Sequence, residues 1–231
     1  MKKIAITQSN YIPWKGYFDL IASVDEFVFY DCVQYTRRDW RNRNRIKSPT
    51  GVIWLTIPVK TKGAYLEKIN TIEVADLNWS NAHWSQIERC YARASSFRLM
   101  ADVLSDLYRG TKSTLLSEIN STLIMGIASF LGVQTTFRHA SEFVLQDGRS
   151  ERLLGICQSV GATTYVSGPS AREYLDVELF SRHGITVEWF DYSGYPEYYQ
   201  LWGEFCHEVS IIDLLMNCGK EASEYFRRKS T

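Results

Sequence analysis

The stretch KKIAITQSNYIPWKGYFDLIASVDEFVFYD, residues 2–31, decides the fold. Residues 2–8 begin it with two apolar side chains two positions apart, which is typical of a strand. A loop with proline and glycine follows, and residues 16–24 then carry apolar side chains at helical spacing. Residues 26–31 form a second β-rich run. A strand, a short helix and a strand in this order predict a βαβ unit, which favours a parallel sheet.

The rest of the chain contains further strand-like and helix-like patterns. Residues 52–59 are β-rich and precede an alternating run within residues 63–75, so a hairpin is expected between them. Apolar side chains recur at three- and four-residue spacing in residues 79–160, which predicts helices. Strands are then expected at residues 143–146, 163–168 and 185–192, and helices at residues 172–184 and 209–219.

These patterns together predict one α/β domain over residues 1–231. Its sheet is expected to be parallel or mixed, with flanking helices. A mostly helical segment over about residues 79–135 is expected to be inserted between the two βα halves.

Composition excludes several classes of protein. The 26 basic side chains balance 26 acidic ones, so the net charge of zero argues against DNA as a partner. Five cysteines occur without a CxxC pair, which is typical of reduced thiols in the cytoplasm. No apolar run approaches the ~18 residues of a membrane-spanning helix, so no membrane partner is expected. An oligomer is compatible with the sequence.

Polar and aromatic side chains occupy the loop after the first predicted strand. Ligands of open α/β sheets bind beyond the carboxyl ends of the strands, so this loop is placed to contact a substrate. Gln8 has both a donor and an acceptor and is a predicted catalytic residue. Tyr11, Trp14 and Tyr17 are predicted to form a wall against a sugar or a base. The alternative interpretation is a packed turn that only fixes the following helix.

Basic residues are concentrated in RRDWRNRNRIK, residues 37–47, where only one acid opposes them. Guanidinium groups bind phosphate through two hydrogen bonds, and amides add neutral donors. The predicted ligands of a di- or triphosphate are Arg38, Arg41, Asn42, Arg43 and Asn44. Trp40 favours a pocket and is predicted to contact the substrate. The alternatives are a solvated charged face and a narrow contact with the end of an RNA.

A second phosphate contact is predicted in YVSGPSAREYLD, residues 165–176. Ser167 and Gly168 precede an expected helix, and the amides at a helix N-terminus favour anions. The spacing matches neither a dinucleotide-binding GxGxxG loop nor a Walker A loop. An ordinary turn with a serine cap is the alternative.

His83 is the predicted general base, because a histidine titrates near neutral pH and this one lies between Trp79 and Trp84 in the sequence. The alternative is a histidine packed in the core. Cys32 lies near the arginine run, where positive charge would lower its pKa and make it a candidate nucleophile, and the favoured alternative is a buried cysteine at a strand end. The histidines show no HxxxH spacing, so no metal site is predicted.

Several separated motifs resemble the WbqC-like protein family. They are residues 6–31, WRNRNRIK at residues 40–47, YVSG and YLD within residues 165–176, and YYQLWGEF and SIIDLLMNCG within residues 198–219. Members often begin with His-Gln-Pro where this chain has Thr7-Gln8-Ser9, so only the glutamine of that triplet is present.

The resemblance implies an enzyme of bacterial O-antigen or related lipopolysaccharide and surface-glycan biosynthesis. The implied substrate is a nucleotide-linked aminosugar. The implied reaction makes the enzyme a transferase of an acyl or aminoacyl group, such as glycyl, to the sugar amine. The donor would be an acyl carrier, coenzyme A or an aminoacyl-tRNA.

A fold-level similarity suggests another reaction. A strand, a loop with PWKGY, a helix and a strand ending near Asp31 are similar to the opening of Rossmann-like HUP nucleotidyltransferase domains. Tyr17 stands where those domains have a histidine. The alternative function is therefore nucleotidyl transfer or adenylation, for which a nucleoside triphosphate would bring Mg²⁺ as the one expected cofactor. A non-catalytic scaffold of a glycan-assembly complex is the third possibility.

Overall fold

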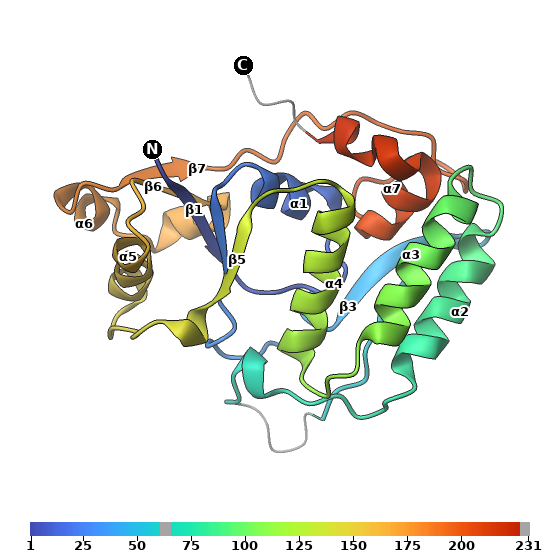
Figure 1. The fold of residues 1–231 in the computed structure, drawn as a ribbon, viewed down its shortest axis with the longest axis horizontal. Coiled ribbons are helices and arrows are strands. Elements are labelled where there is room, and N and C mark those ends of the chain that lie inside the picture. Colours follow the sequence, from blue (N-terminus) through green and yellow to red (C-terminus); the bar gives the residue numbers. More distant parts are fainter. Residues whose placement is uncertain (61–65, 227–231) are drawn as a thin grey trace.

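The central element of the fold is a five-stranded sheet, as seen in a computed structural model that describes residues 1–60 and 66–226 (Figure 1). The strand order is β5-β2-β1-β6-β7, and every neighbouring pair is parallel. The strands are β1 (Lys3–Thr7), β2 (Glu26–Phe29), β5 (Thr136–His139), β6 (Thr164–Ser167) and β7 (Thr186–Trp189). With helices flanking this sheet and a helical region beside it, the predicted α/β fold is confirmed.

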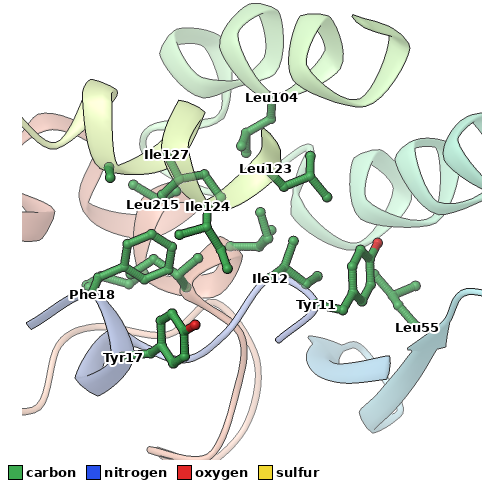
Figure 2. Packing of buried hydrophobic residues seen from close by; sticks show 14 of the residues in the cluster. Tyr11, Ile12, Tyr17, Phe18, Leu55, Leu104, Leu123, Ile124, Ile127 and Leu215 are labelled. Atoms are coloured by element: carbon green, nitrogen blue, oxygen red, sulfur yellow. The ribbon is translucent and has the colours of Figure 1, made fainter. Parts of the chain in front are cut away.

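Two hydrophobic cores cover the two faces of the sheet, because successive side chains of a strand point to opposite faces. The larger core takes Ala5, Phe27, Phe29 and Val166 from the strands. The smaller core takes Ile4, Ile6, Val28 and Tyr165. Figure 2 shows part of the larger core, where Ile12 and Phe18 from the N-terminal segment lie among leucines and isoleucines of the helices.

Helices divide between the two cores. The larger core receives α1 (Lys15–Ala22), α2 (Trp79–Tyr91), α3 (Phe97–Gly110), α4 (Leu116–Phe130) and α7 (Ile211–Cys218). The smaller core receives α5 (Arg149–Ser159) and α6 (Val177–Arg182). Short 3₁₀ turns are η1 (Ile69–Thr71), η2 (Ala140–Glu142), η3 (Pro169–Glu173) and η4 (Gly219–Tyr225). In the described ranges, no helix is long and apolar enough to cross a membrane.

The predicted hairpin has the wrong partner strand. Strand β4 (Gly51–Thr56) pairs antiparallel with β3 (Arg43–Ser48), so the arginine-rich run itself forms the other strand. Asn44 and Ile46 are buried, so one face of this strand is buried. The charged residues beside them make that alternation hard to recognise in the sequence. Residues 66–74 contain η1 and isolated bridges instead, and residues 63–65 lie outside the described part of the chain.

Two other predicted elements differ from the structure. The strand expected at residues 143–146 is absent there, and β5 lies earlier, where Thr136 pairs with Glu26 of β2. Val144 is 93% exposed, whereas Phe143 and Leu145 pack against the smaller core without forming a strand. The helix expected at residues 172–184 is shorter, because η3 precedes it and Asp176 caps α6 by accepting from the amide of Leu179.

Candidate active site

The carboxyl edge of the sheet has a natural binding position between β1 and β6. Strands β2 and β5 continue the sheet on one side of this pair, and β7 continues it on the other. Loops that leave the two central strands therefore diverge, and ligands of open parallel sheets bind in the crevice between them. Ala5 pairs with Val166, so Gln8 and Ser167, at the ends of these strands, belong to the same edge.

A cavity of about 440 Å³ opens at this edge, and we call it the strand-end cavity. It is lined by Ile6, Thr7, Gln8, Tyr30, Val33, Gln34, Arg149, Arg152, Leu153, Tyr165 and Tyr174. Arg149 and Arg152 come from the first turn of α5, whose N-terminal amides add partial positive charge. Neither arginine takes part in an ion pair within the described residues. The cavity is therefore suited to a phosphate or another anion.

Tyrosines give the strand-end cavity neutral hydroxyl donors. Burial raises the pKa of Tyr30, although the nearby Arg152 guanidinium opposes the effect. Burial also raises the pKa of Tyr165, whose hydroxyl lies 3.3 Å from the Ser167 hydroxyl. Both phenols therefore keep their protons at neutral pH, and the positive charge of the arginines is not cancelled.

Sequence reasoning missed Arg149 and Arg152. The signal that would have found them is the order of elements, because GRSERLL begins a helix after β5. Two arginines three positions apart in a first helical turn face the same side. Their position next to Gln8 depends on the strand order, which local patterns do not give.

A second cavity of about 370 Å³ is lined in part by other residues of the first loop, and we call it the aromatic cavity. It is lined by Asn10, Pro13, Trp14, Trp40, Asn44 and Glu208. The Trp14 ring lies 5.6 Å from the Tyr192 ring and 5.5 Å from the Tyr195 ring, measured between centroids. The structure thus brings together Trp14 and Trp40, two of the predicted substrate contacts, with the predicted phosphate ligand Asn44.

Arg41 joins the walls of the two cavities. Its guanidinium donates hydrogen bonds to the side-chain oxygens of Gln8 and Asn10. Gln8 lines the strand-end cavity and Asn10 lines the aromatic cavity, so the two hollows approach each other at this side chain. Both terminal nitrogens of Arg41 already donate, so this geometry gives it a positioning role. Phosphate binding by Arg41 stays a prediction.

The other predicted phosphate ligands of the arginine run do not line the strand-end cavity. Arg43 donates to the Arg38 carbonyl and lies over the Trp54 ring, 4.2 Å from its centroid. The Asn42 amide donates to the Ile57 carbonyl at 2.8 Å. The Asn44 amide donates to the carbonyls of Tyr11 and Ile12, at 3.0 Å each. These two amides hold the hairpin and the first loop, and their role as phosphate ligands stays a prediction.

Ser167 and Gly168 occupy the turn after β6. Ser167 is buried and contacts the strand-end cavity through Tyr165. A side chain at Gly168 would point toward the Tyr192 ring, 3.8 Å away. Gly168 precedes the five-residue turn η3 rather than an α-helix. The helix dipole at the strand-end cavity therefore comes from α5 instead of from the residues after Gly168.

His83 and Tyr11 belong to a hydrogen-bonded chain in the core. The Tyr11 hydroxyl lies 2.7 Å from His83 Nδ1 and 2.8 Å from the Tyr108 hydroxyl. His83 Nε2 lies 3.2 Å from the Thr56 carbonyl, which only accepts, so Nε2 carries the hydrogen and Nδ1 accepts from Tyr11. Burial lowers the pKa of His83 to about 4. The predicted role of His83 as a base stays a prediction and would require Tyr11 to leave Nδ1.

Tyr17 and Asp31 hold the backbone of the first loop. The buried Tyr17 hydroxyl donates to the Gln8 carbonyl at 2.9 Å. The buried Asp31 carboxylate accepts from the Ser9 amide at 2.8 Å and from the Ser117 hydroxyl. Tyr17 and Tyr11 are therefore buried supports of the loop in this structure. Their contact with a substrate stays a prediction.

Of the two interpretations of Cys32, activation by positive charge is wrong in direction, and the side chain is half-buried. Burial raises the pKa of the Cys32 thiol, and this effect exceeds the opposing effect of the Arg152 guanidinium. Only Arg43, Arg45 and Lys47 of the arginine run lie in β3, and the basic groups that lower the pKa of Cys32 are Arg152 and Lys68. Within residues 1–60 and 66–226, no group of three His, Cys, Asp or Glu side chains is placed to hold a metal ion.

Comparison with known proteins shows the family. The model of the WbqC-like protein family matches residues 8–225. A protein of Mycobacterium tuberculosis (strain ATCC 25618 / H37Rv), described as uncharacterized protein Rv1507c, is 51% identical over 227 residues, which cover 98% of each chain. No solved structure matches this chain. The family match extends from Gln8 in the strand-end cavity through both arginines of α5 to the end of the fold, and the chain belongs to the WbqC-like protein family.

Proposed function

We propose that the chain is a transferase of bacterial O-antigen or related surface-glycan biosynthesis that binds a nucleotide-linked aminosugar. The observation that carries this proposal is the strand-end cavity, where Arg149 and Arg152 lie at the switch point of the parallel sheet. A diphosphate there would receive forked hydrogen bonds from both guanidinium groups and partial positive charge from α5. Membership of the WbqC-like family supports the glycan context.

Gln8 is the proposed catalytic side chain at the rim of this cavity. Its oxygen accepts from Arg41, so its amide nitrogen is turned away from that guanidinium and keeps its hydrogens for a ligand. An oriented N–H donor stabilises the negative charge that develops on a carbonyl oxygen during acyl transfer. Arg41 would thus act through Gln8 by fixing which end of the amide faces the substrate.

The proposed reaction moves an acyl or aminoacyl group onto the sugar amine. The amine nitrogen forms a bond to the carbonyl carbon of the donor, and the bond from that carbon to sulfur or oxygen breaks. A proton leaves the nitrogen through a base and ends on the departing sulfur or oxygen. Thioesters of an acyl carrier or coenzyme A and the ester of an aminoacyl-tRNA satisfy this chemistry equally.

Calorimetry with UDP and dTDP tests the binding step. We expect both wild type and the exposed-site control R98A to bind, and R149A and R152A to bind about 10–100 times more weakly. A charge-assisted hydrogen bond contributes about 1.5–3 kcal/mol, and each 1.4 kcal/mol is tenfold in affinity. Absence of binding by the wild type, or equal binding by the arginine variants, would contradict the proposed nucleotide site.

The strand order also supports the second candidate, nucleotidyl transfer. Strands β1 and β6 are neighbours, so the loop with Gln8 and the turn with Ser167 lie at one edge, as in HUP-like domains. Tyr17 is buried beneath the Gln8 carbonyl at the position of the histidine in those domains. Release of pyrophosphate from a nucleoside triphosphate with Mg²⁺ would favour this candidate over acyl transfer. Nucleotide-sugar binding without either reaction would favour the scaffold.

A further inference from the structure

The aromatic cavity differs from the strand-end cavity in its charge. Glu208 is the charged side chain in its lining, and this side chain is largely exposed. Arg45 forms an ion pair with Glu208 and is not itself part of the lining. A carboxylate repels phosphate and attracts a cation or a hydrogen-bond donor. The cavity is therefore suited to a neutral or cationic group.

Aromatic side chains lie beside this carboxylate, because Trp40 lines the cavity and Trp54, outside the lining, packs against Trp40. The rings of Trp40 and Trp54 lie 5.5 Å apart between centroids, at an angle of 34°. Both tryptophans are exposed although they are large and apolar. Trp14 adds a third ring, and Asn10 adds an amide. The Arg43 guanidinium covers Trp54 at 4.2 Å from its centroid, so Trp40 and Trp14 are the rings in the lining on which the C–H groups of a sugar can pack, while carboxylate and amide groups bind the polar substituents.

Trp14 is held in this position by the absence of a side chain at Gly16. A Cβ atom there would lie 2.4 Å from the Trp14 ring. The ring therefore folds over the start of α1 only because residue 16 is glycine. On its other side it packs against Tyr192 and Tyr195. The ring is a fixed wall of the cavity.

The cavity is also in the right place for a substrate that extends from the strand-end cavity. The side-chain oxygens of Gln8 and Asn10 bind the same Arg41 guanidinium, and each belongs to a different cavity. A nucleotide with its phosphates between Arg149 and Arg152 would pass Gln8 before its sugar reaches Asn10.

We propose that the aromatic cavity is the aminosugar subsite and that Glu208 recognises the amine. The identity of this ligand rests on the proposed function. The sugar ring packs on Trp40, and the protonated amine donates to the Glu208 carboxylate. The protonated amine first loses one proton to water, which frees its lone pair, and in the transfer reaction this carboxylate takes the second proton, which leaves the nitrogen as the N–C bond forms. It then returns the proton to the sulfur or oxygen that departs from the acyl carbon.

Ligand-observed NMR with free D-glucosamine, D-glucose and uridine tests this subsite without a nucleotide. Wild type and the exposed-site control E178Q are expected to bind glucosamine about tenfold more tightly than glucose. E208Q is expected to lose this preference while keeping its glucose affinity, and E208D is expected to restore part of it. W40A is expected to lose both sugars. Equal binding of the two sugars by wild type, or a preference that survives in E208Q, would overturn the proposal.

The uridine arm separates a sugar subsite from a base subsite. Uridine that binds wild type and loses affinity in W40A would place a nucleobase in the aromatic cavity and overturn the proposal. UDP binding is expected to be the same in wild type and E208Q, because its phosphates belong to the strand-end cavity. If UDP does not bind while glucosamine shows its Glu208-dependent preference, the nucleotide part of the proposed function fails and the aminosugar subsite stands.

Discussion

The strand-end cavity and the aromatic cavity share one edge of the molecule but have opposite chemistry. The strand-end cavity has neutral tyrosines and two arginines at the start of α5, which form no ion pair with any residue that the structure describes. The aromatic cavity has tryptophans and the carboxylate of Glu208. One is suited to an anion and the other to a neutral or cationic ring. This difference is what an enzyme needs if it holds a phosphorylated group and a sugar amine at the same time.

The two cavities also have different structural origins. The strand-end cavity follows from the parallel sheet, because the order of its strands leaves a crevice between β1 and β6. The aromatic cavity depends on the β3–β4 hairpin region and the segment after β7, which supply Asn44 and Glu208. A common fold therefore gives the anion site, and elements added to it give the second site. The loop at residues 8–14 is the wall between them.

The largest expected effect is a loss of UDP binding that leaves glucosamine binding unchanged. The double variant R149A/R152A removes both guanidinium groups from the strand-end cavity, and we expect UDP affinity to fall by about 10²–10⁴-fold. Glucosamine binding in the same variant is expected to remain within twofold of wild type. Calorimetry for UDP and NMR for glucosamine measure the two effects. A parallel loss of both ligands would show that the cavities are one site.

A smaller expected effect is the change in stability with pH that comes from the buried His83. His83 has a pKa of about 4 in the folded protein and about 6.5 when unfolded, so only the unfolded state gains a proton between these values. The contribution of His83 to the free energy of unfolding is therefore fully present above pH 6.5. It is lost as the pH falls toward 4, by on the order of 3 kcal/mol. Urea unfolding from pH 7.5 to pH 4 measures the slope.

The variant H83Q tests the assignment of that slope. It removes the titrating group and keeps a donor and an acceptor for Tyr11 and Thr56. We expect lower stability at pH 7.5 and a shallower fall toward pH 4 than in wild type. An unchanged slope in H83Q would assign the pH dependence to other groups. Loss of transfer activity in a stably folded H83Q with unchanged sugar binding would instead support His83 as the base.

The sequence predicted the part of the site that is local and missed the part that depends on topology. β1, α1 and β2 follow from periodicity, so Gln8 was correctly expected at a strand end. Trp14 and Trp40 were expected near a ligand, and both line a cavity. Arg149 joins Gln8 only because α5 follows β5 and β1 is central in the sheet. The spacing of residues along the chain does not show that Arg149 and Gln8 are neighbours.

Local charge was a poor guide to the site where burial and pairing decide which groups a ligand can reach. The arginine run has the composition of a phosphate loop, but it pairs with β4 and buries Asn44 in hydrogen bonds to the first loop. Positive charge near Cys32 suggested one interpretation, an activated thiol, whereas burial raises the pKa of that thiol. Composition indicates which side chains are present. Their availability to a ligand depends on partners that lie far away in the sequence.

Variants of Arg41 test whether this side chain couples the two cavities. Without its guanidinium, the Gln8 amide is free to rotate, and we expect R41A to reduce kcat by about 10²-fold, as for loss of one oriented oxyanion donor. UDP and glucosamine affinities are expected to change by less than about fivefold. R41K retains the charge but not the fork that binds Gln8 and Asn10 together, so it is expected to behave like R41A. Full activity in R41K would show that only the positive charge of Arg41 matters and that its two hydrogen bonds do not.

The smallest expected effect affects the aromatic cavity alone. In G16A the new methyl group takes the place of the Trp14 ring, which must swing away from Tyr192 and Tyr195. Alanine favours the helix by up to about 1 kcal/mol, and the lost packing costs about 1–3 kcal/mol, so the net change in stability is small. Glucosamine affinity is nevertheless expected to fall severalfold while UDP affinity is unchanged. G110A is the matched control, because a side chain there meets no atom within 4 Å. If G16A weakens UDP as much as glucosamine, Trp14 supports the whole edge of the sheet, and the difference between the two cavities does not depend on its ring.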